Sequence, residues 1–294
     1  MLRGVLAGLA AGALWGLVFV MPRMVEGFSA VDLASGRFVA YGAFSALVMA
    51  LARRPLPTLR QALGALGLSL LGFTGYYTLL VFAVRDAGAE VPALIIGTIP
   101  VWVMFLGKPG HLRWMALLPG LLLTAAGLAL MMSAPQAQEP GSAVHWWRGV
   151  ALAVVSLASW TAFALLNAAW LRRHREVAAT DWANWLGVAT GLGALALWLL
   201  AGSSPAEMLA QPQAGRYLFL SLATGLGSAW LATILWNVAS QRLSASLCGQ
   251  LIVSETLFAL LYAFAWEGRW PDPAQSVACV LFTLGILSSV KAHR

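Results

Sequence analysis

Long apolar runs separated by short polar segments dominate the chain. A helix needs about 20 predominantly apolar residues, within a range of roughly 17–25, to cross the hydrocarbon core of a bilayer. The runs are continuous rather than alternating, which is typical of membrane helices and not of barrel strands. The pattern predicts ten membrane-spanning helices, at residues 4–21, 32–51, 61–84, 91–107, 114–133, 149–171, 182–201, 217–239, 243–266 and 273–290.

Composition points to the same class of protein. Hydrophobic residues make up 60% of the 294 residues and charged residues only 10%, whereas average soluble domains are roughly half apolar and about a quarter charged. A soluble enzyme, a disordered chain and a disulfide scaffold are therefore disfavoured. Cys248 and Cys279 lie in apolar runs and are interpreted as small hydrophobic residues. The net charge of +7 is dispersed, so a nucleic-acid partner, which requires a clustered basic face, is not expected.

The distribution of lysine and arginine predicts the orientation. Ten spans place both ends of the chain on one side of the membrane. That side carries twelve Lys and Arg residues and the opposite side five, and short loops rich in these residues stay in the cytoplasm. We therefore expect an inner-membrane protein with both termini cytoplasmic. The first run is longer than the roughly 7–15 residues of a signal peptide's apolar region, so we expect it to be retained.

A weak internal repeat divides the chain into two halves. Several matches occur in the same order at nearly constant offset, which favours a duplication of five helices. An odd number of helices per half inverts the second half in the membrane, as in many transporters. We predict a first repeat at 1–134, a connecting loop at 135–148 and a second repeat at 149–294. The principal matches are residues 14–16 with 159–161, Asp32 with Asp181, and Gly42 with Gly191.

These features together resemble the drug/metabolite transporter superfamily, in its ten-helix branch with two EamA-type halves. The residues that carry the resemblance are Trp15, the Arg37-Phe38 pair and Glu255. The abundance of tryptophan is similar to that of YddG-type aromatic amino acid exporters. The resemblance implies a transporter and not an enzyme, with a central cavity formed by spans 1, 3, 4, 6, 8 and 9. Glu255 is followed by Thr256, where the superfamily often has proline, so a hinge at that point is not expected.

Glycine and proline mark candidate packing and gating positions. Gly4, Gly8, Gly12 and Gly16 recur every four residues and share one face of the first span. Such a face lets a neighbouring helix approach closely, either as static packing or as a surface that slides during gating. Pro100 lies in the middle of the fourth span, where it removes a backbone hydrogen bond and predicts a kink.

Two charged residues lie inside predicted spans. A charge at the centre of a membrane helix costs at least about 2.5–3.5 kcal/mol. Arg37 is close to the outer interface, where it is expected to reach water or to pair with Asp32 or Glu90. Glu255 is near the middle of the ninth span and has no obvious partner in the sequence. It is either a neutral group bonded to the backbone or a proton-sensitive group that faces the substrate.

Aromatic and polar side chains in the middle of spans are candidates for substrate binding. Aromatic faces suit an aromatic or aliphatic side chain through stacking and burial. For any single residue, contact with lipid or another helix is the alternative interpretation. The predicted substrate-binding residues are Tyr76, Tyr77, Thr98, Trp102, Trp160, Phe163, Trp236, Asn237 and Ser244, with Ser156, Asn167 and Gln250 as further polar candidates.

The sequence therefore predicts a membrane exporter of small amphipathic metabolites, with aromatic and other hydrophobic amino acids as the expected substrates. Alternating access through a central cavity is the expected mechanism. No cofactor and no metal are expected, and the bilayer and a small-molecule substrate are the expected partners of a monomer. The alternatives are a transporter of the same fold for a drug cation, a sugar or a nucleotide conjugate, and an integral-membrane enzyme acting on lipids.

Overall fold

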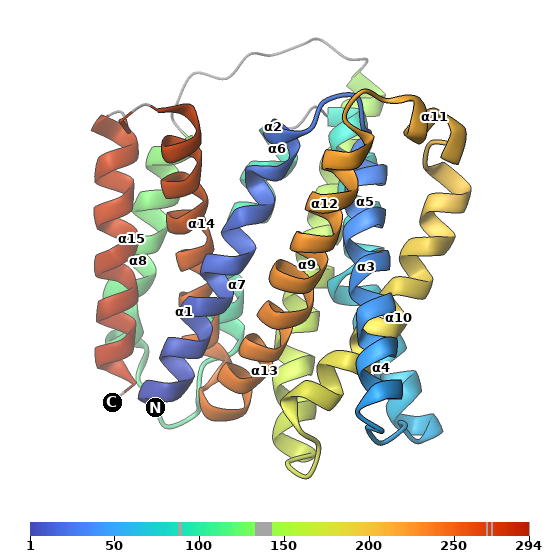
Figure 1. Ribbon diagram of the computed structural model, residues 1–294. Coiled ribbons are helices and arrows are strands. Elements are labelled where there is room, and N and C mark those ends of the chain that lie inside the picture. The colour runs from blue at the N-terminus through green and yellow to red at the C-terminus, as the bar shows by residue number, and fades with distance from the viewer. Residues whose placement is uncertain (88–89, 133–142, 269, 272, 294) are drawn as a thin grey trace.

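The computed structural model describes residues 1–294 except 88–89, 133–142, 269, 272 and 294, and the described residues contain helices and no strands. The long helices run side by side, and both termini lie at one end of the bundle (Figure 1). We call this the terminal end, and the opposite end, where α11 (Pro205–Ala210) lies, the far end (Figure 1).

The first half holds eight α-helices and a 3₁₀ turn. They are α1 (Leu2–Gly16), a 3₁₀ turn (Leu17–Phe19), α2 (Met21–Met24), α3 (Ala30–Leu51), α4 (Leu59–Gly72), α5 (Thr74–Ala87), α6 (Glu90–Gly97), α7 (Ile99–Leu106) and α8 (Trp114–Met132).

The second half holds seven α-helices and a π-helical segment. They are α9 (Ala143–Arg173), α10 (Ala179–Ala201), α11 (Pro205–Ala210), α12 (Ala214–Thr224), a π-helical segment (Gly225–Leu231), α13 (Ala232–Arg242), α14 (Ala245–Glu267) and α15 (Pro273–Ala292).

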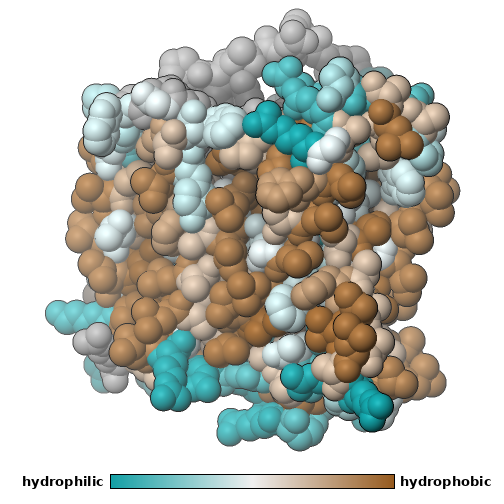
Figure 2. Space-filling model, viewed as in Figure 1, coloured by the Kyte–Doolittle hydropathy of each residue, from teal (hydrophilic) through white to brown (hydrophobic). Residues whose placement is uncertain are grey.

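The ten predicted spans correspond to helical crossings of the bundle. Among the described residues, seven continuous helical stretches are at least 18 residues long and apolar enough to cross a membrane, and three shorter apolar helices supply the others. Hydrophobic residues cover the visible face at mid-height, and hydrophilic residues gather at the two ends (Figure 2). The exposed large hydrophobic side chains are mostly leucine. An exposed apolar belt of this extent indicates contact with lipid. The prediction of an all-α integral membrane protein is confirmed.

Three of the ten crossings are broken near mid-height. The third breaks at Phe73, between α4 and α5, and the fourth breaks at Thr98, just before Pro100. The eighth contains the π-helical segment between α12 and α13. Such breaks release backbone groups from regular hydrogen bonding, and membrane proteins tolerate them where the helix lines a cavity or is buried in protein. The predicted kink at Pro100 is confirmed.

Helices of one half pack mainly on helices of the other half. The pairs α3–α10, α8–α15 and α7–α14 join helices at equivalent positions of the two halves. Gly42 of α3 and Gly191 of α10 meet at a crossing so close that a Cβ at either position would lie 2.6–2.7 Å from the Cα of the other. The glycines that the sequence repeat matches therefore face each other, and the inverted relation of the two halves stays a prediction.

The connection between the halves differs in length from the predicted loop. Helix α9 begins at Ala143, six residues before the predicted start at residue 149. Alanine and arginine are good helix formers, and Trp146 and Trp147 are partly exposed on this first turn, where membrane interfaces accommodate tryptophan. The predicted end of the fifth span at residue 133 and the loop residues before 143 lie outside the described residues.

Candidate substrate passage

A chain of aromatic side chains crosses the centre of the bundle. Trp236 of α13 is 1% exposed and lies between Trp15 of α1, with ring centroids 5.3 Å apart, and Trp160 of α9, at 6.4 Å. Trp160 packs against both of the buried apolar clusters of the molecule. The three tryptophans thus come from three helices that belong to both halves of the chain.

The aromatic chain continues from Trp160 toward α3. Phe163 lies 6.0 Å from Trp160 and 5.3 Å from Phe73, the residue at which the third crossing breaks. Phe73 is 5.9 Å from Phe38, and Tyr77 meets the edge of Phe38 at 6.2 Å. Centroid separations of 4.5–7 Å are typical of interacting aromatic pairs. We call this set, Trp15, Trp236, Trp160, Phe163, Phe73, Phe38 and Tyr77, the aromatic chain.

One polar atom in the middle of this chain has no partner. The indole Nε1 of Trp236 is buried and makes no hydrogen bond to the described residues. Buried indole N–H groups normally donate to an acceptor, because an unmet donor costs about 1–3 kcal/mol. This atom is therefore a free donor among apolar surfaces.

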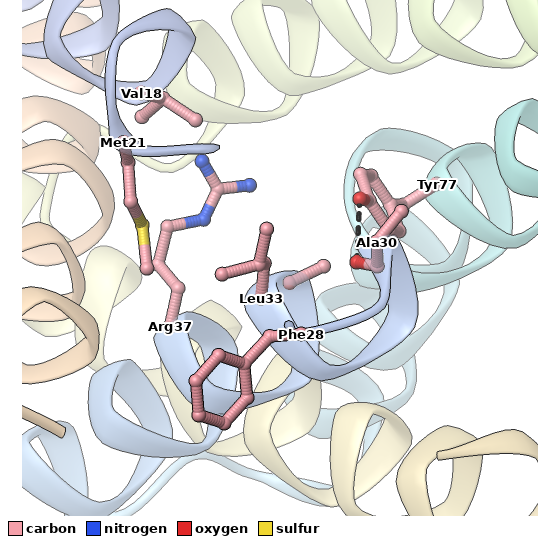
Figure 3. A pocket seen from close by; sticks show the side chains of 8 residues that line it. Val18, Met21, Phe28, Ala30, Leu33, Arg37 and Tyr77 are labelled. Atoms are coloured by element: carbon pink, nitrogen blue, oxygen red, sulfur yellow. Dashed lines mark hydrogen bonds between the residues drawn. The ribbon is translucent and has the colours of Figure 1, made fainter. Parts of the chain in front are cut away.

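A pocket of about 280 Å³ lies beside the far-end part of the aromatic chain, between the end of the first crossing and α3 (Figure 3). Its walls are mostly apolar, and Arg37 supplies the charge. The residues that line it are Val18, Met21, Phe28, Ala30, Leu33, Ala34, Arg37 and Tyr77.

Arg37 sits on the aromatic chain and has free hydrogen-bonding capacity. Its guanidinium carbon lies 4.4 Å from the centroid of the Phe38 ring. Its Nε is buried and has no hydrogen-bond partner among the described residues. The pairing with Asp32 that the sequence suggested is wrong, because the Asp32 carboxylate accepts hydrogen bonds from Ser29 and Ser203 at 2.7–3.1 Å. The side chain of Glu90, the other suggested partner, lies outside the described residues.

Glu255 lies close enough to Arg37 for their charges to interact. The charges of the two residues act on each other, and the hydroxyl groups of Tyr76 and Tyr77 belong to the same interacting group. The Tyr77 hydroxyl donates to the carbonyl of Ala30 at 2.8 Å, which joins α5 to the start of α3. The sequence offered no obvious partner for Glu255. Arg37, remote in the sequence, is a charged group that acts on it electrostatically, and no ion pair between the two is present among the described residues.

Asn237 and Ser244 already have hydrogen-bond partners within the protein. The Nδ2 of Asn167 donates to the Oδ1 of Asn237 at 3.1 Å, and the Nε1 of Trp182 donates to the Oδ1 of Asn167 at 2.7 Å. The hydroxyl of Ser244 accepts from the backbone N–H of Leu247 and caps α14. These contacts join the two residues to the protein near the terminal end, and substrate binding by them stays a prediction.

The other polar candidates are also engaged with the protein. The Nε2 of Gln250 donates to Thr124 at 2.9 Å and its Oε1 accepts from Ser289, so it joins α14 to α8 and α15. The hydroxyl of Ser156 donates to the main-chain carbonyl of Tyr76, and that of Thr98 donates to the carbonyl of Ile95. None of these contacts tests substrate binding, which stays a prediction for them.

Trp102 is separated from the other predicted aromatic residues. Its side chain is 46% exposed, while Ile99, Pro100 and Val103 of the same helix are buried against the bundle. No ring contact joins Trp102 to the described aromatic chain. Its place in the passage stays a prediction, and contact with lipid explains its exposure as well.

The glycine face of α1 is a close-packed contact with α14. A Cβ at Gly8 would strike Leu251, one at Gly12 would strike Ser254, and one at Gly16 would lie 2.8 Å from the backbone nitrogen of Ala259. The small residues allow the first crossing to lie directly on the helix that carries Glu255. The predicted close approach of a neighbouring helix to the glycine face is confirmed, and a sliding motion of α1 against α14 stays a prediction.

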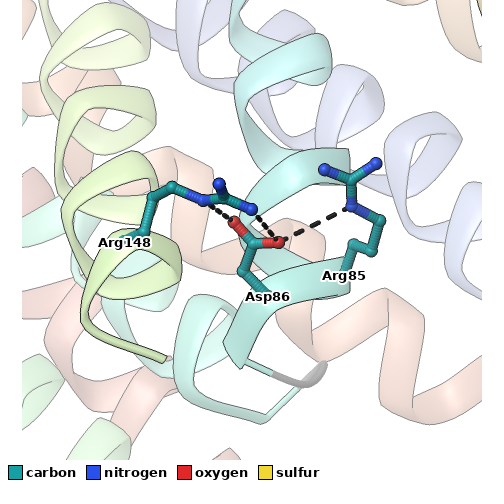
Figure 4. A network of polar contacts seen from close by, with 3 residues as sticks. All are labelled: Arg85, Asp86 and Arg148. Atoms are coloured by element: carbon teal, nitrogen blue, oxygen red, sulfur yellow. Dashed lines mark hydrogen bonds and ion pairs between the residues drawn. The ribbon is translucent and has the colours of Figure 1, made fainter. Parts of the chain in front are cut away.

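The far end also carries a fixed ionic contact between the halves. Arg148 of α9 makes two hydrogen bonds to the Asp86 carboxylate of α5, at 2.6 and 2.9 Å, and Arg85 lies 3.6 Å from the same carboxylate (Figure 4). Across the parts of the chain that the structure describes, no group of three His, Cys, Asp or Glu residues is placed to hold a metal ion.

An apolar outer belt, crossings broken at mid-height and an aromatic centre shared by two halves define an integral membrane protein of the transporter class. The chain belongs to the EamA-like transporter family. The family model matches residues 2–133. Over 309 aligned positions the chain is 32% identical to the inner membrane protein YtfF of Escherichia coli (strain K12), covering 99% of this chain and 96% of that protein.

A solved crystal structure shares the fold, with a TM-score of 0.79 at 19% identity over 99% of this chain and 97% of that chain. Transporters of the EamA family are in general not enzymes. The narrower resemblance to YddG-type aromatic amino acid exporters finds no support in these relatives and stays a prediction.

Sequence reasoning found part of the aromatic chain and missed the rest. It placed Tyr77, Trp160, Phe163 and Trp236 together correctly in space. It used Trp15 only as a marker of the family and did not consider Phe73. Gly72 and Gly75 flank Phe73 in the sequence and are the signal that could have indicated a break in the helix. In the structure the helix is broken there, and a Cβ at Gly75 would collide with the carbonyl oxygen of Leu70.

Proposed function

We propose that the protein is an inner-membrane exporter of small amphipathic metabolites, and that aromatic and other hydrophobic amino acids are its substrates. The single observation that carries this proposal is the aromatic chain, which runs between the two halves through Trp15, Trp236 and Trp160. Flat apolar faces stabilise an aromatic side chain by stacking and by area burial. The free Nε1 of Trp236 offers a hydrogen-bond donor on the same path.

Alternating access is the proposed mechanism. The two halves meet along close helix contacts such as Gly42 with Gly191, and rocking about such a crossing would open the passage to one side at a time. Broken crossings border the aromatic chain at Phe73, where the helix can change direction without losing a complete hydrogen-bonded turn. The pocket beside Arg37 would then be the opening at the far end.

We further propose that the protein works as a monomer with both termini in the cytoplasm, and that the far end faces the periplasm. The twelve-to-five distribution of Lys and Arg supports this orientation. The inner-membrane location of the relative YtfF supports the choice of membrane. Neither a nucleic acid nor a metal is part of the proposal.

The alternative substrates fit the charges of the passage less well. A phosphorylated sugar or nucleotide would require several cationic groups, since each phosphate carries almost two charges. Arg37 is the cation that lines the pocket. A permanently cationic drug would meet that same positive charge. A lipid enzyme would need a nucleophile and a base, and the free cysteines Cys248 and Cys279 lie among apolar residues.

Transport by proteoliposomes tests the proposal. Purified protein should release trapped tryptophan, phenylalanine and leucine faster than empty liposomes do. W160A and W236A should slow tryptophan release by roughly three- to tenfold, because a stacking surface is lost. Trp147, which is 65% exposed on the same helix as Trp160, provides the control variant W147A. Unchanged release by folded W160A and W236A would contradict the proposed passage.

Proton coupling at Glu255 is a separate part of the proposal and has its own test. E255Q keeps the size of the side chain and removes its charge. If Glu255 exchanges protons during transport, the dependence of tryptophan release on pH should flatten in E255Q. An unaltered pH profile would remove Glu255 from that role and leave the aromatic passage in place.

A further inference from the structure

We propose that Arg37 is the carboxylate-binding subsite of this transporter, and that the far-end pocket holds the carboxylate end of the substrate while the aromatic chain holds its apolar end. This inference rests on the proposed function and makes it narrower. The preferred substrate would be an aromatic or aliphatic molecule with a carboxylate, such as an amino acid, and not the corresponding amine or amide.

The first argument is the free hydrogen-bonding capacity of the guanidinium. Arginine presents five N–H donors in a planar fork that matches a carboxylate. The Nε of Arg37 is buried without a partner, and the side chain lines a pocket of about 280 Å³ (Figure 3). A buried donor on a charged group is expensive to leave unmet. A carboxylate that enters the pocket would satisfy it.

The second argument is that the protein holds this arginine in place from one side only. The guanidinium lies 4.4 Å from the centre of the Phe38 ring, and an aromatic face stabilises a cation without using its N–H groups. Among the described residues, no carboxylate lies within ion-pair distance of Arg37. Asp32, five residues before Arg37 on the same helix, already accepts hydrogen bonds from Ser29 and Ser203.

The third argument is continuity with the apolar passage. Phe38, which supports Arg37, is 5.9 Å from Phe73, and Phe73 is 5.3 Å from Phe163. A substrate with its carboxylate on Arg37 would therefore place an apolar side chain along the same row of rings. Tyr77 both lines the pocket and contacts Phe38, so the two regions share a wall.

Glu255 extends the subsite to an ammonium group. It acts electrostatically on Arg37 from the opposite half of the chain. The ammonium group of an amino acid would be favoured near Glu255 and the carboxylate on Arg37, so that the two charges of the zwitterion meet two opposite charges of the protein. The competing interpretation is that Glu255 merely neutralises Arg37 and that neither residue contacts the substrate.

The pocket is small enough to select by size. Pockets for drug-sized ligands are roughly 300–1,000 Å³, so a pocket of about 280 Å³ suits a ligand no larger than a small metabolite such as an amino acid. A larger anion would have to leave part of its charge among the apolar walls formed by Val18, Met21 and Leu33. That arrangement favours one carboxylate over a phosphate with its larger charge.

The experiment compares four indole probes in proteoliposomes: tryptophan, indole-3-propionate, tryptamine and tryptophan amide. R37Q should slow release of tryptophan and indole-3-propionate by about ten- to a hundredfold, the range expected for a lost charge-assisted contact. It should leave tryptamine and tryptophan amide within about twofold of wild type. R37K keeps the charge and loses the planar fork of N–H donors, so it should release the carboxylate probes at a rate between those of wild type and R37Q.

The matched control is R85Q. Arg85 also lies over an aromatic ring, 4.7 Å from the centre of Phe82, but it is exposed and outside the pocket. R85Q should release all four probes as wild type does. An equal loss of all four probes in R37Q, or no loss, would overturn the carboxylate subsite while the aromatic passage could still stand. If R37Q does not fold, R37K tests the subsite in its place. The quantity compared is then the ratio of the release rate of the carboxylate probes to that of tryptophan amide.

A binding measurement separates failure of the subsite from failure of the proposed function. In detergent, indole-3-propionate should raise the thermal midpoint of wild type and not that of R37K or R37Q. If wild type transports none of the probes but shows this shift, the proposed function is wrong and the subsite stands. If wild type shows neither transport nor a shift, both are wrong.

Discussion

Two buried polar sites at opposite ends of the bundle differ in how their atoms are paired. Near the terminal end, the amide groups of Asn167 and Asn237 bond to each other, and the indole of Trp182 completes the set. At the far end, Arg37 lies beside a pocket and its Nε has no partner. Two inverted halves would give equivalent ends if the molecule were symmetric in conformation. A state that is sealed at the terminal end and open at the far end would show this difference.

The comparison also separates two kinds of buried polar residue. Those that hold helices together have donors and acceptors paired within the protein, as in the Trp182–Asn167–Asn237 network, which the stacked rings of Trp170 and Trp182 cover at 3.5 Å. Those that would act on a substrate keep a free atom next to a space, as Arg37 does. Residue type alone does not distinguish the two, and neither does an unpaired atom alone, since Ser240 and Ser246 also have buried hydroxyls without a partner. Arg37 combines an unpaired donor with a place in the wall of a pocket.

The contact between Gly42 of α3 and Gly191 of α10 should be the position at which substitution destabilises the protein most. G42V should destabilise the protein by more than about 1–3 kcal/mol, because the added groups would meet the backbone of Gly191 and not a movable side chain. Thermal unfolding in detergent measures the loss. The control is G67A, since a Cβ at Gly67 meets nothing within 4 Å. Equal stability of G42V and G67A would show that the two halves are not in contact at this glycine pair.

Breaking the terminal-end network should have the next largest effect. N167L leaves the indole of Trp182 and the amide of Asn237 without their partner, so we expect a loss of about 1–3 kcal/mol for each unmet group. Thermal unfolding gives the loss, and a cysteine introduced at Leu243 should become more reactive from the terminal side. A stable N167L variant with unchanged reactivity would mean that this network does not form the seal.

Removing the far-end ion pair should change conformation more than stability. The Arg148 side chain is half exposed, and exposed ion pairs contribute little to stability. R148Q should therefore unfold at nearly the same temperature as wild type. Because the pair joins α5 to α9, its loss should change the exposure of a cysteine placed at Leu33 (L33C). A large fall in thermal midpoint together with unchanged exposure would contradict this assignment.

The smallest effect concerns the cap of α11 at the far end. The backbone N–H and the hydroxyl of Ser204 hydrogen-bond with the Glu207 side chain and backbone, and the bond from the Ser204 N–H, at 2.7 Å, holds the pKa of Glu207 below its ordinary value. A lowered pKa stabilises the folded state above the ordinary value of about 4.3 and the contribution fades as the pH falls through the folded value.

Hydrogen exchange in residues 205–210 measures that contribution. Protection, corrected for intrinsic exchange, should be constant from pH 8 to 6 and should decrease at pH values below the ordinary pKa of glutamate. E207Q should show weaker protection at neutral pH and no such decrease. A decrease of the same size in E207Q would assign the acid sensitivity to another group.

The sequence predicted the helices well and the passage less well, for a physical reason. Runs of about 20 apolar residues are local properties of the chain, so the ten crossings and the kink at Pro100 could be predicted from them. The partners of Asn237 and Gln250 are set by packing between remote segments. Asn237 and Asn167 are 70 residues apart, and nothing local to either shows that they bond to each other.

The helix caps show the same limit on a smaller scale. Ser244 is polar and lies between two spans, which is equally typical of a binding residue and of an N-cap. Its bond to the backbone of Leu247 decides between them. Trp15, by contrast, was recognised as a family marker, and only the structure shows that it touches Trp236.

The most direct test of the account is alkylation of a cysteine in the far-end pocket. L33C, placed in a protein whose Cys248 and Cys279 are replaced by alanine and whose fold is verified, lines the pocket beside Arg37. A membrane-impermeant maleimide should label it from the side opposite the termini, and tryptophan should slow the labelling. Labelling only from the terminal side, or labelling that tryptophan does not slow, would contradict the account.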